Sequence, residues 1–243
     1  MKGIGFALIG VLLTSQTAAA EPVWSQISLT AAPSNAAQVV AATDKLMSSE
    51  IGKTFPGKLL LQINAADGTN PATHTFVPIY KTAAEREAFV QSLQGNAAWT
   101  EFQATLERVT QPGGTVMNQV LKHWGDINDT DHVWTAHAFD VRDPARFLAA
   151  INAFMASATG KKFPGQVYLS GVVAGGLSPV SHIISVGYAS EAEMADWLAV
   201  RDASADWAAY QTASEPTGEF LGTTLARDIK SWGPATLQQL VAP

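Results

Sequence analysis

Two histidines occupy the same place in two related stretches of this sequence, and a tyrosine follows each of them six residues later. His74 precedes Tyr80, and His182 precedes Tyr188. Residues an even number apart share one face of a β-strand, so each pair should lie on one stripe. A histidine and a tyrosine on one stripe can bind a polar group or move a proton. The alternative is structural: each histidine bonds a carbonyl of the proline-containing loop before it.

Tryptophans recur in the same stretches. Trp99 is followed by Phe102, and Trp207 by Tyr210, with the same spacing. A tryptophan in a cavity wall suits planar or aromatic ligands, whereas a core tryptophan contributes packing that costs about 3–5 kcal/mol to remove. We assign no catalytic residue at this point. Six side chains are candidate ligand-binding residues: His74, Tyr80, Trp99, His182, Tyr188 and Trp207.

All these matches belong to one internal repeat. The motif Gly-Lys-x-Phe-Pro-Gly at 52–57 returns at 160–165, and the offset of 108 residues then holds without a gap. Between 52–125 and 160–233, 22 of 74 aligned positions are identical. Unrelated segments would match at about one position in fifteen. The chain is therefore a tandem duplication.

The repeat and the N-terminal composition set the expected domain boundaries. Lys2, an apolar run over 4–13 and the segment Ala18-Ala19-Ala20 are typical of a cleaved signal peptide. The apolar run is too short to span a membrane, so we expect no span after cleavage. The sequence also has no cysteine. We therefore expect a periplasmic or secreted bacterial protein, divided into a signal peptide (1–20), a first module (21–126), a second module (131–234) and a C-terminal tail (235–243).

Each module is predicted to run strand, helix, strand, strand, helix, strand. Period-two alternation marks the strands, and the capping boxes Thr82-x-x-Glu85 and Ser190-x-x-Glu193 begin the second helices. Pro78 inside the third strand predicts an edge position or a bulge. This order is the ferredoxin-like βαββαβ unit, an α+β fold with helices on one face of an antiparallel sheet. The bare sheet faces are apolar, so we expect the two modules to pack face to face within one chain.

The chain resembles the dimeric α/β-barrel superfamily, and in particular its antibiotic-biosynthesis-monooxygenase-like members. The resemblance rests on the element order, on His74 or His182 opening the third strand, and on the Trp-x-x-aromatic motif after the second helix. Members often build a barrel from two chains, and this duplication is similar to such a dimer fused. The resemblance implies an intramolecular barrel and cofactor-independent oxygenase or isomerase chemistry.

Haem, metals and nucleic acid are not expected. Haem-degrading relatives place a histidine about three helical turns after the tryptophan, but Val109 and Thr217 stand ten residues after Trp99 and Trp207. The sequence has no paired-histidine metal spacing. Its net charge is −6, with 15 scattered lysines and arginines, whereas nucleic-acid binding needs clustered positive charge. We predict no cofactor and no metal.

Two functions are compatible with the sequence. In the first, the exported protein binds a small apolar or aromatic molecule between its two sheets, in a site lined by the six candidate side chains, with or without catalysis. In the second, it is a non-catalytic envelope protein that acts through self-association, as a homo-oligomer, or through protein contacts. An open cavity of a few hundred cubic ångströms favours the first function, and a space filled by aromatic side chains favours the second.

Overall fold

A computed structural model describes residues 21–175 and 179–241, so the predicted signal peptide lies outside the described residues. The two modules have the same element order, with the second helix of each divided in two. The first contains β1 (Val23–Ala31), α1 (Ala36–Ser48), β2 (Lys58–Ala66), β3 (His74–Tyr80), α2 (Ala83–Ser92), α3 (Ala97–Val109) and β4 (Thr110–Gly125). The second contains β5 (Val133–Val141), α4 (Pro144–Ala156), β6 (Gln166–Ala174), β7 (His182–Tyr188), α5 (Glu191–Asp202), α6 (Ala205–Ser214) and β8 (Gly218–Trp232), and a short helix α7 (Leu237–Val241) follows it.

Local sequence signals explain where these elements begin and end. The Thr82 and Ser190 hydroxyls accept hydrogen bonds from the backbone N–H of Glu85 and Glu193, as the capping boxes predict. The Phe-Pro-Gly corner needs its glycine because two chain segments meet there. A Cβ atom on Gly57 would lie 2.0 Å from the carbonyl oxygen of Ile79. Any side chain at position 57 would clash with the backbone of β3, so this position requires glycine.

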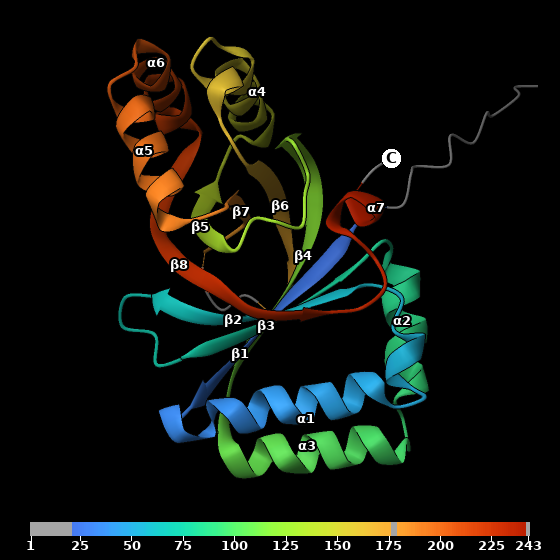
Figure 1. Cartoon of the computed structure of the whole chain (residues 1–243). Coiled ribbons are helices and arrows are strands. Elements are labelled where there is room, and N and C mark those ends of the chain that lie inside the picture. Colours follow the sequence, from blue (N-terminus) through green and yellow to red (C-terminus); the bar gives the residue numbers. More distant parts are fainter. Residues whose placement is uncertain (1–20, 176–178, 242–243) are drawn as a thin grey trace, which may run out of the picture.

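The eight strands of the described chain form one closed antiparallel barrel in the order β1-β3-β2-β8-β5-β7-β6-β4. Each module contributes four adjacent strands, and two pairings between modules, β2 with β8 and β4 with β6, close the barrel. The fold is therefore the predicted intramolecular dimeric α/β barrel, with two ferredoxin-like modules joined along two seams. Figure 1 shows the helices of the two modules on opposite sides of the barrel, with α1 and α3 far from α4 and α6.

The predicted edge position or bulge at Pro78 is wrong. β3 lies between β1 and β2, and its register with β1 continues unshifted from Trp24↔Ile79 to Ile27↔Phe76. Pro78 instead stands opposite Leu59 of β2 inside the sheet. β3 is an inner strand within the first module itself, because β1 and β2 flank it, and the missing proline donor is accommodated by a gap in the β1–β3 ladder.

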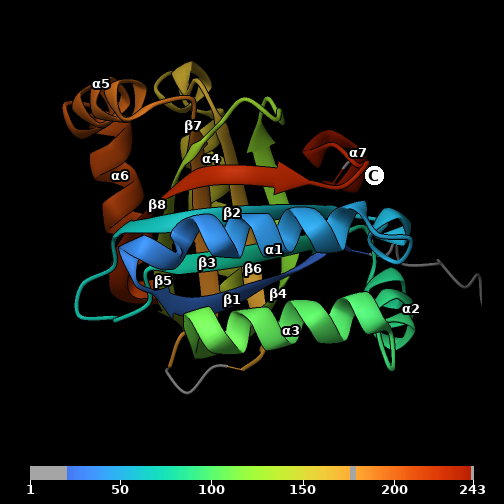
Figure 2. The same cartoon turned by 60° about the horizontal axis from the view of Figure 1, so that its bottom comes forward.

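Helices cover the outer face of the barrel. The apolar core therefore has one part between the sheet and the helices and another part in the lumen. Figure 2 shows α1 and α3 side by side across the strands of the first module. One cluster of buried residues lies in the lumen, and it includes Trp24, Leu60, Val77 and Tyr168. α7, in the segment predicted as a tail, adds Leu240 and Val241 to this lumen cluster. Sequence reasoning assigned no element to that segment.

Candidate functional site

The six candidate residues do not face the lumen, and this part of the prediction is wrong. On β3 the side chains of Thr75, Val77 and Ile79 line the lumen, whereas Phe76 packs against α1 through Val39. His74 and Tyr80 share the face of Phe76. Alternation shows which residues lie together, but it does not show which face of the strand is inside. The two sets of candidates therefore belong to two separate helix-covered layers on opposite sides of the barrel.

The three candidates of the first module lie in a filled core. His74 is buried, and its Nδ1 lies 2.8 Å from the hydroxyl of the preceding Thr73. Tyr80 packs edge-on against Phe55, with ring centroids 5.4 Å apart. Trp99 stacks on Phe102 of the same helix, α3, with ring centroids 5.4 Å apart. Burial lowers the pKa of His74 and raises that of Tyr80 to about 12, so both side chains are neutral near pH 7.

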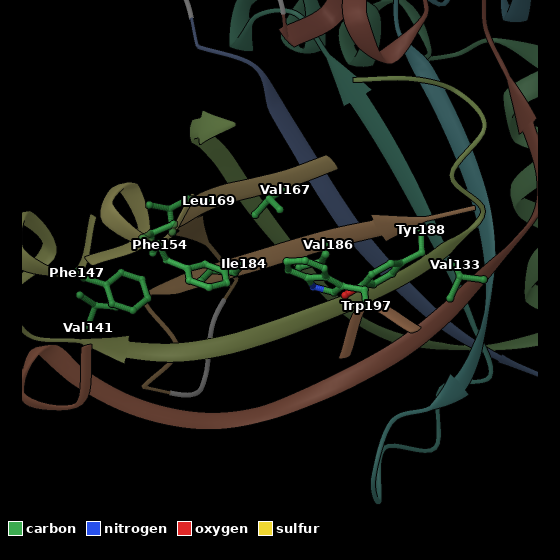
Figure 3. Close-up of a cluster of buried hydrophobic side chains, with 11 residues drawn as sticks. Val133, Val141, Phe147, Phe154, Val167, Leu169, Ile184, Val186, Tyr188 and Trp197 are labelled. Atoms are coloured by element: carbon green, nitrogen blue, oxygen red, sulfur yellow. The ribbon is translucent and has the colours of Figure 1, made fainter. Parts of the chain in front are cut away.

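In the second module the corresponding layer contains a cavity of about 500 Å³. Tyr188 and Trp207 line this cavity. His182 lies beside it: its ring is 6.2 Å from that of Phe147, which is a wall residue, and its Nδ1 contacts the Ser181 hydroxyl at 3.0 Å. The remaining wall is mostly aromatic and aliphatic, and Figure 3 shows part of it: Phe147, Phe154, Val167, Ile184, Val186 and Trp197.

At two positions the hollow second module carries a smaller or more polar side chain than the filled first module. Ile184 takes the place of Phe76, and Ser214 takes the place of Leu106. Phe76 and Leu106 pack in one cluster of the first module, with the Phe76 and Phe102 rings 6.3 Å apart. Ile184 and Ser214 instead line the cavity. We refer to this space between β5–β8 and α4–α6 as the helix-side cavity.

A chain of hydrogen-bonded side chains runs along one wall of the helix-side cavity. The two nitrogens of His137 contact two threonine hydroxyls: Nε2 lies 3.1 Å from Thr135 Oγ1, and Nδ1 lies 2.7 Å from Thr223 Oγ1. The Thr135 hydroxyl also bonds the side chain of Tyr188. Burial, reinforced by the charge of Arg201, lowers the pKa of His137 to about 4. The imidazole is therefore neutral at pH 7, and the chain joins the buried Tyr188 to the exposed Thr223.

Arg201, at the end of α5, supplies a positive charge to the same cavity. Its guanidinium carbon lies 4.3 Å from the centroid of the Trp207 ring, over the ring face. Nε and Nη2 both contact Asp202 Oδ1 at 2.7 Å. The side chain of Arg201 is 20% exposed and that of Asp202 is 57% exposed, so the ion pair points toward solvent. Arg201 also lines the cavity, and Nη1 takes no part in the ion pair.

The lumen holds a second, smaller cavity of about 210 Å³. Polar uncharged side chains, among them Gln26, Ser28 and Thr224, line it beside Trp24 and Trp134. A small ligand could enter this space, but the lining brings together neither a histidine nor a cation. The larger helix-side cavity combines volume, aromatic walls and polar groups, and we therefore take it as the candidate site.

The described residues that line the helix-side cavity hold few of the side chains that usually bind a metal ion in a protein. Among the described residues that line it, His137 is the one histidine, and both of its nitrogens are engaged by threonine hydroxyls. Over residues 21–175 and 179–241, no cluster of three or more histidine, aspartate or glutamate side chains has the geometry to hold a metal.

Sequence reasoning missed His137 and Arg201. It searched for residues that the two copies share, whereas these two differ between the copies. In the first module Ile27 stands at the position of His137, and Leu93 stands at the position of Arg201. A polar residue that replaces an apolar one in only one copy is the signal that could have identified them.

The structural comparisons agree with this architecture. A candidate monooxygenase from Lactobacillus acidophilus superposes with a TM-score of 0.63 at 10% sequence identity, covering 89% of this chain and 97% of that one. A second candidate monooxygenase, from Fusobacterium nucleatum, gives 0.61 at 14% identity and covers 90% and 97%. An anthrone oxidase-like protein gives 0.56 at 12% identity and covers 87% and 92%. No protein-family model and no curated protein sequence matches the chain. At these identities the likeness shows a shared dimeric α/β-barrel fold.

Proposed function

We propose that this dimeric α/β-barrel chain binds one planar aromatic molecule in the helix-side cavity of its second module. The observation that carries the proposal is the cavity of about 500 Å³, which has an aromatic wall and a few polar groups at one side. Small-molecule sites typically have this composition and a volume of about 300–1,000 Å³. The same layer of the first module is packed, so the expected stoichiometry is one ligand per chain.

The hydrogen-bonded chain through His137 supports a further step, proton removal from the bound molecule. A ligand hydroxyl or acidic C–H group can give its proton to the Thr223 oxygen while the Thr223 proton moves to His137 Nδ1. This leaves a ligand anion beside an imidazolium. Two neighbours in the comparison are named as monooxygenases and one as anthrone oxidase-like. We propose oxygenase- or isomerase-like chemistry without a cofactor, in which this chain supplies binding and proton transfer.

We propose that the protein works outside the cytoplasm. The signal-peptide pattern in residues 1–20 supports this location. Among the described helices, none combines the length and the apolar character needed to cross a bilayer. The alternative, a non-catalytic envelope protein that self-associates, is supported by apolar side chains that are exposed along the seams, such as Leu121 and Val173. The size of the helix-side cavity favours ligand binding over that alternative.

The proposal is tested with a neutral bicyclic probe, 2-naphthamide, by tryptophan fluorescence and calorimetry. We expect one equivalent to bind, because Trp197 and Trp207 line the cavity. Probe at about 100 times its dissociation constant should stabilise the fold by ~2.7 kcal/mol. Ile184→Phe, which introduces the side chain of the filled copy, should abolish binding.

A matched variant separates the two cavities. Ala136 lines the lumen cavity, so Ala136→Val should fill part of the lumen and leave probe binding unchanged. Loss of binding in Ala136→Val together with retention in Ile184→Phe would place the ligand in the lumen and contradict the proposal. The absence of any binding up to millimolar probe would contradict it as well.

A further inference from the structure

The position of Arg201 distinguishes the hollow module from its filled twin. In the first module the equivalent residue is Leu93, which is 7% exposed and belongs to the packed core. The two modules share one fold and differ in whether this layer holds a cavity. A guanidinium is costly to place beside apolar side chains, and the hollow module carries one where the filled module carries a leucine. The chain thus contains its own comparison between a module with a ligand space and a module without one.

The geometry keeps part of the guanidinium available to a ligand. Stacking on Trp207 fixes the plane of the group, and Asp202 occupies Nε and Nη2 from the solvent side. Nη1 has no hydrogen-bond partner among the described residues. A planar guanidinium held in this way can donate to a carboxylate with little loss of side-chain freedom.

Apart from Asp202, the titratable groups around the cavity add no charge close to the guanidinium of Arg201. His137 is neutral at pH 7 because its pKa is about 4. Burial raises the pKa of the Tyr188 and Tyr210 hydroxyls, so both stay protonated. Glu215 is the one carboxylate among the described lining residues, and it is exposed to solvent at the rim. Arg201 is therefore the one cationic side chain among the described lining residues, and its close counter-charge is Asp202 on the solvent side.

We propose that the ligand of the helix-side cavity is an aromatic acid whose carboxylate is bound by Arg201. This inference rests on the proposed function and adds the substrate class. The rings of the ligand lie among Phe147, Phe154 and Trp197, and the carboxylate accepts a hydrogen bond from the guanidinium beside Trp207. The competing explanation is structural: Arg201 stands in the last turn of α5, where a cation is favoured by the helix dipole.

Two probes of one shape separate these explanations. 2-Naphthoate and neutral 2-naphthamide are titrated into the full chain and into Arg201→Gln. We expect naphthoate to bind the unmodified chain at least tenfold more tightly than naphthamide. Arg201→Gln should weaken naphthoate at least tenfold and leave naphthamide unchanged. Arg146→Gln, on the exposed surface of α4, should change neither affinity.

Arg201→Lys keeps the charge without the planar group, and it should recover part of the naphthoate preference. Thermal melting shows whether Arg201→Gln folds. If it does not fold, Arg201→Lys replaces it in the comparison of the two probes. Equal affinity for the two probes in the unmodified chain, or equal weakening of both in Arg201→Gln, overturns the inference and leaves the proposed function standing. Failure of both probes to bind the unmodified chain overturns the proposed function itself.

Discussion

Ser25 and Thr135 occupy equivalent positions in the two modules, but only the second has a hydrogen-bond partner. The Thr135 hydroxyl contacts His137 Nε2 at 3.1 Å. Ser25 Oγ is buried with no partner among the described residues, and the residue that matches His137 is Ile27. The first module therefore keeps one hydroxyl of the chain and has lost the imidazole that would satisfy it. An unpartnered buried hydroxyl costs about 1–3 kcal/mol.

This difference makes a prediction for a matched pair of variants. Ser25→Ala should raise the free energy of unfolding by about 0.5–2 kcal/mol, because it removes an unsatisfied buried oxygen. Thr135→Val should lower it by about 1–2 kcal/mol, because it leaves His137 Nε2 and the Tyr188 side chain without their shared partner. Urea unfolding measures both. Destabilisation in Ser25→Ala as large as that in Thr135→Val would show that the Ser25 hydroxyl is satisfied in solution.

At this scale the sequence identified some of the site and missed its polar part. Tyr188 and Trp207 were predicted to line a pocket between the sheets, and they line the helix-side cavity instead. His137 and Arg201 were not predicted, because neither recurs in the other copy. Recurrence reports what both modules need, which is mainly the fold. A group that serves one cavity has to be sought among the differences between the copies.

α3 and α6 cover their sheets in the same way, but they present different side chains to them. Leu106 of α3 packs with Val39, Phe76 and Phe102, whereas Ser214 of α6 borders the cavity. One side chain on each helix thus accounts for part of the difference between a filled and a hollow layer.

Replacing Ser214 and Leu106 each by its counterpart in the other module should change the free energy of unfolding in opposite directions. Ser214→Leu should raise the free energy of unfolding by about 1–2 kcal/mol through new apolar burial, and it should weaken 2-naphthamide binding. Leu106→Ser should cost about 3–5 kcal/mol, because it leaves a cavity and places a hydroxyl in a packed core. Thermal or urea unfolding gives the stabilities, and fluorescence titration gives the binding. Unchanged probe affinity in Ser214→Leu would indicate that the ligand does not reach α6.

The elements were largely predictable, and their orientation was not. Period-two patterns, capping boxes and Phe-Pro-Gly corners report local structure, and they gave the element order of both modules. Which strand face would lie inside depends on how the second module closes the barrel. Both faces of β3 are apolar enough to be buried, as Phe76 on one face and Val77 on the other show. α7 is too short to show a helical period, so it was missed.

On the scale of the whole molecule, each module reaches across the seam to the first helix of the other. Trp124, at the end of β4, donates through Nε1 to Asn152 Oδ1 of α4 at 3.2 Å. Trp232, at the end of β8, donates to Asp44 Oδ1 of α1 at 2.7 Å. Together with the β2–β8 and β4–β6 ladders, these contacts make the modules mutually dependent.

The two halves should therefore not fold alone. Expressed separately, 21–126 and 127–243 each expose seam strands and an apolar sheet face, so we expect aggregation or non-cooperative melting. Mixed or co-expressed, they should form a 1:1 complex with the circular dichroism spectrum of the intact chain. Size-exclusion chromatography with light scattering detects the complex. A soluble, monomeric and cooperatively melting half would show that the seams are dispensable.

Covalent linkage of the two modules has a consequence that a barrel of two identical subunits cannot share. In a symmetric dimer every substitution appears twice, so hollowing out one side also weakens the other. Here the first module keeps its packed layer, while the second contains the helix-side cavity. Because the two modules are fused in one chain, a substitution in one leaves the other unchanged. A ligand site can therefore form in one module while the other stays fully packed.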